Sequence, residues 1–515
     1  MNLVPTIYGL IAGLVTGPMI LAAVTQAGAA SELQGTKDVL RDGPSLAEFV
    51  DRIVTNRMGE FRVPGAVVTV VRGDRVLVNK GYGFADLEDR RPVDPEKTLF
   101  RIASVSKVFN AMAVMRLVDE GLIGIDEDVR PRLRAAGLEL DTTAEGPITL
   151  RALLTHTAGI RDLSTPDLAM TKDPGKLLPL GPYLKQCLPL RWQDPGETVL
   201  YTDIGITLAG YVVEVVSKTE FQEYVLTKVI RPLGMRHTSY TLSEEQRAHL
   251  ATAYSHEASG YKATPFLYSN NYPASGVITT GSDMARLMIA HLSGCKGFLT
   301  AKTVKLMHEP QHSDDPRLGV QWTCGFVYET HSKGNTPYLF HFGGAFDMQS
   351  ILGISLDRGI GVFVSQNRPG GRVFQLVDLL DALSQDEART DSAAKPPVTA
   401  VTEPANIKSL AGTYVLNRDL SRGVKIPPQE YVFVRYVEDI KGIEVEYWQT
   451  KDSPMRLIQV APLLFQSVNG DQRLSFRTSK DGQTTYLIDY NMRGDGAFKR
   501  ISPLDRPSVP ERHQR

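Results

Sequence analysis

Strand patterns lie at both ends of a long helical region, and this order restricts the fold more than any other feature of the chain. The N-terminal patterns are a hairpin, in which two valine-rich runs surround Arg72-Gly73-Asp74, and a third strand around 81–83. The C-terminal patterns occupy 319–330, 338–342, 348–355 and 359–366. Helical periodicity marks 44–61, 104–121, several segments of 150–310 and 372–384. We therefore expect an α+β fold, with one antiparallel sheet assembled from both ends and flanked by helices.

The character of the sequence changes after the last of these helices. Residues 385–404 are polar and contain prolines, which is typical of a linker. Residues 405–503 carry short alternating runs between turns, which predicts an all-β, barrel-like domain of about eight strands. We expect a first domain at 44–384 and a disordered tail at 504–515.

The first thirty residues are uncharged, and residues 3–24 are mostly apolar. Charged side chains begin only at Glu32, and Ala27-Gly28-Ala29 offers a small-x-small cleavage site. This predicts a secretory signal peptide at 1–30, cut near Ala29 or Ala30. The apolar run 3–24 is also long enough to remain as a membrane anchor. Either alternative places the rest of the chain outside the cytosol, secreted or attached to a membrane.

Charge and side-chain chemistry exclude some classes of function. The 57 basic and 58 acidic residues are interleaved and nearly balanced, so nucleic acid is not an expected partner. The ten histidines show no metal-ligand spacing, and we expect neither a metal site nor a cofactor. Cys187, Cys295 and Cys324 are far apart, which leaves open one disulfide or three buried thiols.

A nucleophile and its base are predicted at Ser104-Val105-Ser106-Lys107, where the helix 104–121 begins. Residues i and i+3 share a helix face, so the Lys107 amine would point toward the Ser104 hydroxyl, which needs a base in order to react. The helix N-terminus would favour an oxyanion on Ser104 and a neutral Lys107. Alone, the pattern is more typical of an N-cap serine followed by a solvated lysine.

Three further segments carry candidate residues. Tyr201 follows a turn and precedes a helix, so its phenol either reaches a cleft or packs at the helix start. His341-Phe342-Gly343-Gly344 is a strand that ends in a glycine pair, which either exposes backbone N–H groups to a substrate or forms a simple turn. His156 is a possible base, but we favour a structural role beneath the site.

The order Ser104-x-x-Lys107, Tyr201-x-Asp203 and His341-x-Gly343 resembles the serine β-lactamase and penicillin-binding-protein superfamily. It is most similar to the class C β-lactamase-like branch, with its esterases, D-aminopeptidases and transesterases. The resemblance covers about 44–384, and 405–503 resembles the lipocalin-like C-terminal domains of some members. It extends to Val63-Pro64-Gly65-Ala66, Thr98-Leu99-Phe100-Arg101-Ile102-Ala103, Leu153-Leu154-Thr155-His156-Thr157-Ala158-Gly159, Pro232-Leu233-Gly234-Met235 and Ala274-Ser275-Gly276-Val277-Ile278-Thr279-Thr280.

The resemblance implies a role for each matching residue. Ser104 would be the acylated nucleophile and Lys107 the base that takes its proton. Tyr201 would share proton transfer with Lys107 and help protonate the leaving group. The backbone N–H groups of Ser104 and Gly344 would form the oxyanion hole.

Two positions depart from the β-lactamase pattern. Asp203 stands where many members have asparagine, and its charge would hold Lys107 protonated and disfavour anionic substrates. His341 stands where β-lactamases have lysine, while Gly343 is retained, so a partner for a substrate carboxylate is lost. The resemblance therefore implies a serine hydrolase for small esters, amides or peptides, an esterase or peptidase rather than a dedicated β-lactamase. An acyltransferase or transesterase of natural-product biosynthesis, and a non-catalytic binding protein of the same fold, are the alternatives.

Overall fold

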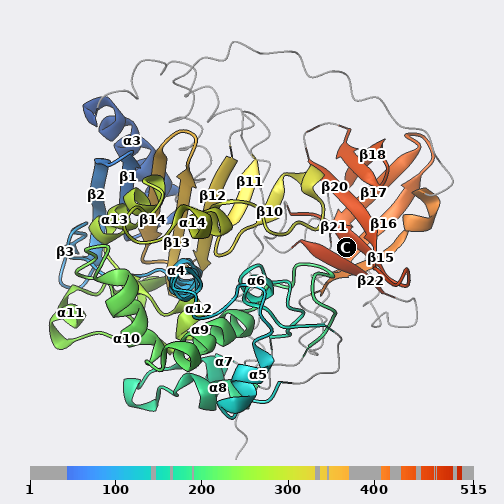
Figure 1. Ribbon diagram of the computed structural model, residues 1–515. Coiled ribbons are helices and arrows are strands. Elements are labelled where there is room, and N and C mark those ends of the chain that lie inside the picture. The colour runs from blue at the N-terminus through green and yellow to red at the C-terminus, as the bar shows by residue number, and fades with distance from the viewer. Residues whose placement is uncertain are drawn as a thin grey trace, which may run out of the picture.

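The computed structural model contains a helix-and-sheet body followed by a barrel (Figure 1). The residues that it describes are 43–140, 146–162, 166–187, 191–330, 337–344, 347–369, 407–417, 431–447, 454–468, 470, 472–490 and 496–501. The predicted N-terminal segment 1–30, the helix 372–384, the linker 385–404 and the tail 504–515 lie outside the described residues.

The sheet of the first body has eight strands in the order β10-β11-β12-β13-β14-β1-β2-β3. Its central pairing joins β1 (Gly65–Arg72) to β14 (Ile360–Gln366), so an N-terminal strand lies against a C-terminal one. This confirms the expected antiparallel sheet built from both ends. The remaining strands are β2 (Arg75–Asp86), β3 (Arg91–Pro92), β10 (Val320–Trp322), β11 (Val327–Thr330), β12 (Pro337–Gly344) and β13 (Gln349–Ser355).

Two strand boundaries differ from expectation. The third strand predicted around 81–83 is wrong, because these residues continue β2. Pairing with β1 runs residue by residue from Val70↔Val78 to Gly65↔Gly83, so no break separates 81–83 from the rest of the strand. The single strand predicted at 319–330 is split into β10 and β11 at Gly325, whose φ of 116° favours glycine.

Helices cover both faces of the sheet (Figure 1). On one face, α3 (Gly43–Phe61) packs Leu46 and Val50 in a cluster with Val68 and Val70 of β1. Alternate residues of β1 face the larger core on the other side, as the period of two in a strand requires. That core includes α4 (Ser106–Asp119), α9 (Asp203–Ser217) and α13 (Gly281–Leu292).

Short elements connect these layers. The other helices are α5 (Arg130–Ala135), α6 (Leu150–Leu154), α7 (Pro166–Ala169), α8 (Leu180–Cys187), α10 (Phe221–Val225), α11 (Glu244–His249), α12 (Tyr272–Ser275) and α14 (Ala301–His308). Tighter or wider turns are η1 (Ala103–Val105), η2 (Pro174–Lys176), η3 (Leu226–Ile230), η4 (Pro316–Leu318) and η5 (Lys408–Leu410). Three small ladders pair β4 (Phe100–Arg101) with β9 (Ile278–Thr279), β5 (Met170–Thr171) with β8 (Tyr268–Ser269), and β6 (Ala253–Glu257) with β7 (Gly260–Thr264).

The second body is a closed antiparallel barrel, which confirms the expected all-β module. Its interior is filled by large apolar side chains, among them Tyr414, Phe465 and Phe476. It lies beyond the β10 edge of the sheet (Figure 1). Its strands are β15 (Gly412–Leu416), β16 (Tyr431–Val437), β17 (Gly442–Tyr447), β18 (Met455–Ala461), β19 (Leu464–Ser467), β20 (Arg473–Thr478), β21 (Thr485–Ile488) and β22 (Ala497–Ile501).

The structure also bears on the possible disulfide and on membrane-spanning helices. Cys187, Cys295 and Cys324 are three buried thiols, not partners in a disulfide. Within the described ranges, no helix has the length and apolarity needed to cross a membrane.

Candidate active site

Ser104 lies in η1, the tight turn between β4 and α4, rather than in the first turn of the α-helix as the sequence predicts. Ala103 precedes it with a φ of 46°, a left-handed conformation that is strained for a residue with a side chain. β12 lies against this turn, since a Cβ on Gly343 would collide with the carbonyl oxygen of Ile102. The turn and the glycine-rich strand end are therefore brought side by side.

Lys107 is buried on α4, with only 1% of its side chain exposed. Its Nζ donates to Ser104 Oγ at 3.0 Å, to Asp203 Oδ1 at 2.7 Å and to the Ala274 carbonyl oxygen at 3.1 Å. An ammonium group has three N–H donors, and here each has an acceptor. The geometry fits a charged lysine, with Ser104 among its partners.

The charge of Lys107 reflects two opposing influences. Burial lowers the pKa of Lys107, while the Asp203 carboxylate and Tyr201 raise it, and the net direction is upward. The expectation that the helix N-terminus leaves this lysine neutral is therefore wrong for the resting site, whereas the expectation that the Asp203 charge holds it protonated agrees with this direction. A full carboxylate charge in direct contact outweighs the partial charge of a helix end.

Tyr201 lies between a loop and the start of α9. Its ring lies beside Lys107, and the distance from Lys107 Nζ to the ring centroid is 4.8 Å. Its hydroxyl interacts with both Lys107 and Ser104, and burial raises the pKa of Tyr201. The ring packs against His156 at 4.3 Å and Trp322 at 6.1 Å between centroids. The two alternatives for Tyr201 therefore hold together, because the ring packs at a helix start and the hydroxyl also reaches the serine.

His156 supports Tyr201 and its loop. Its Nδ1 accepts a hydrogen bond from the Thr202 backbone N–H at 3.3 Å, and its carbonyl oxygen accepts from Leu200 N–H at 2.8 Å. Its backbone has a φ of 58°, which fixes the turn after α6. These contacts agree with a structural role beneath the site.

His341 is buried on β12 and faces the same charges. Its Nδ1 donates to the Phe342 carbonyl oxygen at 2.9 Å, which leaves Nε2 as an acceptor. Burial and the Lys107 charge lower the pKa of His341 to about 3, so the ring is neutral at neutral pH. A neutral imidazole offers no charge to a substrate carboxylate.

A polar group behind Asp203 was not singled out from the sequence. Asn271 Nδ2 donates to Asp203 Oδ2 at 3.3 Å, and Ser275 Oγ donates to Asn271 Oδ1 at 2.9 Å. These contacts orient the carboxylate toward Lys107. The available signal was Asn270-Asn271, just before the segment 274–280 that carries part of the resemblance.

The site brings together a serine hydroxyl, a buried ammonium and a phenol within one network of contacts, next to exposed backbone at Gly344. Such a set can transfer an acyl group through a serine ester. Among the residues that the structure describes, no cluster of three histidine, cysteine or acidic side chains could hold a metal ion.

Comparisons with known proteins show the family and the fold of the first body. The family described as Beta-lactamase matches residues 50–386. Protein flp of Staphylococcus aureus is 23% identical over 355 residues, 67% of this chain and 68% of that protein. The octameric penicillin-binding protein homologue from Pyrococcus abyssi has a TM-score of 0.56 at 20% identity, over 88% of this chain and 99% of its own. EstCE1, a hydrolase with promiscuous acyltransferase activity, has a TM-score of 0.58 at 23% identity, over 66% of this chain and 99% of its own. At these identities, the two structures show similarity of fold alone.

Proposed function

The chain belongs to the beta-lactamase family, and from that premise we propose that it is a serine hydrolase, in which Ser104 forms an acyl-enzyme with an ester or amide substrate. One observation carries the proposal, namely the 3.0 Å contact between Ser104 Oγ and the buried Lys107 Nζ. A serine at that distance from a lysine has a base within reach once the lysine loses its proton.

The proton transfers follow from the network. After Lys107 releases a proton to solvent, it accepts the proton of Ser104 as Oγ attacks the substrate carbonyl. The backbone N–H groups of Ser104 and Gly344 stabilise the resulting oxyanion. The proton on Lys107 then passes through the Tyr201 hydroxyl to the leaving group, which departs. Water hydrolyses the acyl-enzyme by the reverse sequence.

The charges around the nucleophile support esters and uncharged amides as substrates. His341 is neutral and Lys107 is paired with Asp203, so a substrate carboxylate meets no free cation among these residues. A substrate without a carboxylate avoids this unfavourable burial. We therefore propose an esterase or peptidase activity over a dedicated β-lactamase activity.

The test is covalent labelling of the full-length protein with a fluorescent fluorophosphonate, together with turnover of p-nitrophenyl butyrate. Wild type should be labelled and should release p-nitrophenol, whereas Ser104→Ala should do neither. Ser106→Ala is the matched control, because it removes the other serine hydroxyl of the same motif. Ser106 is fully buried, and its Oγ accepts a hydrogen bond from the Val277 backbone N–H at 3.0 Å. Absence of labelling in wild type, or equal labelling of Ser104→Ala, would refute the proposal. Product analysis with added butanol distinguishes transfer to an alcohol from hydrolysis.

A further inference from the structure

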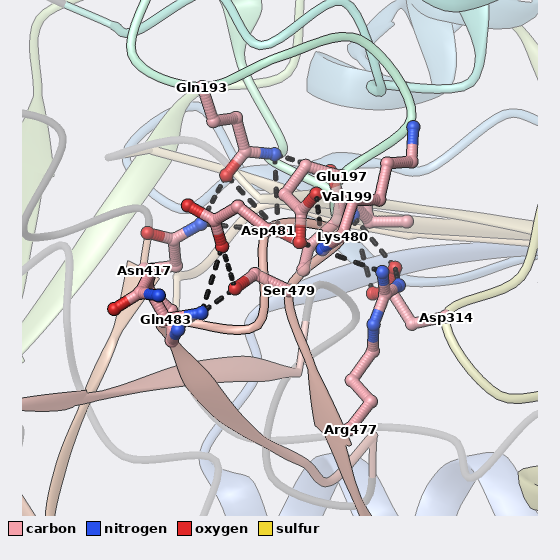
Figure 2. A network of polar contacts seen from close by, with 12 residues as sticks. Gln193, Glu197, Val199, Asp314, Asn417, Arg477, Ser479, Lys480, Asp481 and Gln483 are labelled. Atoms are coloured by element: carbon pink, nitrogen blue, oxygen red, sulfur yellow. Dashed lines mark hydrogen bonds and ion pairs between the residues drawn. The ribbon is translucent and has the colours of Figure 1, made fainter.

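The C-terminal barrel packs against the loop 192–200, which leads into Tyr201. Figure 2 shows this contact, where side chains of the barrel meet Gln193, Glu197 and Val199 of the loop and Asp314 of the segment before β10. The loop ends two residues after Val199, at the phenol that touches Ser104. The barrel therefore lies one short segment from the proposed chemistry.

Asp314 joins the barrel to the loop. Its side chain is fully buried, and its two carboxylate oxygens accept from the Val199 backbone N–H at 3.1 and 3.3 Å. The barrel supplies two more partners, the Tyr490 hydroxyl at 3.0 Å and Arg477 Nη1 at 3.5 Å. His312 Nε2 completes the set at 3.2 Å. One carboxylate thus fixes the backbone of the loop with a geometry that depends on the barrel.

A second contact holds the start of the loop. Asn417, directly after β15, donates from Nδ2 to Gln193 Oε1 at 2.6 Å and to Thr198 Oγ1 at 3.1 Å. Its Oδ1 accepts from Trp192 Nε1 at 3.2 Å. Gln193 Nε2 in turn donates to the Thr198 carbonyl oxygen at 2.7 Å. One barrel side chain, that of Asn417, therefore contacts the loop at both Gln193 and Thr198.

The charges across this contact are complementary. The first body contributes the carboxylates of Asp314 and Glu197, which are largely buried. The barrel contributes Arg477, 3.7 Å from Glu197 Oε1, and the Lys480 backbone N–H, 3.5 Å from Glu197 Oε2. Buried carboxylates need such partners, because an uncompensated buried charge is strongly unfavourable. The barrel thus supplies charged and polar partners to both of these buried carboxylates.

On the far side, the loop is held by His156 through Leu200 and Thr202. The loop is therefore clamped between the turn after α6 and the barrel. Because the interior of the barrel is filled by its own side chains, the part it contributes here is its outer surface and rim.

We propose that the barrel is a built-in positioning partner of the active site, and that Asp314, held by Arg477 and Tyr490, sets the place of Tyr201. Asp314 and Asn417 are positioning residues, since they act through Val199 and Thr198 rather than on the substrate. This inference rests on the proposed function, because it concerns the phenol that shares proton transfer with Lys107.

The test uses the full chain with three single variants, Asp314→Asn, Tyr490→Phe and Asn417→Ala. Active sites are first counted by exhaustive fluorophosphonate labelling, and kcat, KM and the pH profile of p-nitrophenyl butyrate hydrolysis are then measured per labelled site. We expect kcat per site to fall about 10-fold or more in Asp314→Asn and several-fold in the other two, with little change in KM and a shifted pH profile. Arg456→Ala is the control, because it breaks only the exposed ion pair with Asp439 on the barrel.

Normalising to labelled sites separates positioning from loss of folded protein. A purely structural defect lowers the number of labelled sites and leaves kcat per site and the pH profile unchanged, and that result would overturn the inference. Tyr490→Phe and Asn417→Ala decide the matter even if Asp314→Asn does not fold. If wild type itself is not labelled, the proposed function fails first. If wild type is labelled and all three variants match it per site, only the positioning role fails.

Discussion

Lys107 and Asp203 form an ion pair at the centre of the site, with 2.7 Å between Nζ and Oδ1. The ammonium is buried, whereas 31% of the carboxylate side chain is exposed. The pair therefore places a charged lysine next to a serine that needs a neutral base. The pKa of Lys107 is raised, so the neutral fraction of this lysine is small near pH 7. Below the pKa, that fraction increases about tenfold for each unit by which the pH rises.

Asp203→Asn should make the site active at lower pH. Removal of the carboxylate charge lowers the pKa of Lys107, and an opposite charge at this distance typically shifts a pKa by about 1–3 units. The acid limb of the pH profile for p-nitrophenyl butyrate acylation should therefore move to lower pH by a similar amount, with a higher rate at pH 7. Asp51→Asn is the matched control, since it removes an ion pair with Lys80 at the surface. Loss of activity at every pH would instead identify Asp203 as a required proton acceptor.

His341→Lys should improve reaction with anionic substrates. The neutral imidazole would be replaced by a side chain that can carry charge, and a hydrogen bond to a charged group contributes about 1.5–3 kcal/mol. We expect kcat/KM for a p-nitrophenyl hemisuccinate ester to rise about 10-fold relative to the butyrate ester. His341→Gln, which stays neutral, should leave the ratio near that of wild type. An unchanged ratio in His341→Lys would contradict our account of substrate charge.

The fold follows from the sequence because its strands carry strong local patterns. Runs of valine in β1 and the alternation in the barrel could be assigned without tertiary information, and their order gave the antiparallel arrangement. The continuation of β2 through 81–83 could not be assigned, since glycines at 81 and 83 look like a break when the pairing partner is unknown. The resemblance placed Ser104, Lys107 and Tyr201, and it also led to the prediction that Asp203, 96 residues away, holds Lys107 charged. The contact of Asp314 with Tyr490 joins residues 176 apart and has no sequence signal at all.

Gly343→Ala should damage the site through its backbone. An added Cβ would collide with the Ile102 carbonyl oxygen, which lies just before the nucleophile turn. Overpacking of this kind typically costs about 1–3 kcal/mol and would displace β12 from Ser104. We expect a lower melting temperature and a large loss of esterase activity.

Gly344→Ala is the matched comparison for that change. A Cβ there would meet only Phe342 Cε1 at 3.4 Å, so its thermal stability should stay close to that of wild type. Equal melting temperatures for the two variants, measured by circular dichroism, would show that the approach of β12 to Ile102 is not tight.

The buried histidine pair of α13 and α14 should make the protein sensitive to acid. His291 Nδ1 lies 2.9 Å from His308 Nε2, and burial lowers both pKa values, that of His308 to about 4. Below pH 6.5 the unfolded chain therefore binds protons that the folded chain excludes. The free energy of unfolding therefore keeps its full value above pH 6.5 and decreases as the pH falls toward 4. For His308 alone the decrease amounts to about 3 kcal/mol.

Urea unfolding of wild type between pH 8 and 4 measures this loss. His308→Gln keeps a polar partner for His291 but cannot be protonated, so its free energy of unfolding should fall less steeply below pH 6.5. Above that pH, the difference between the two proteins should not depend on pH. Parallel slopes for both proteins from pH 6.5 to 4 would mean that His308 is not buried as a neutral ring.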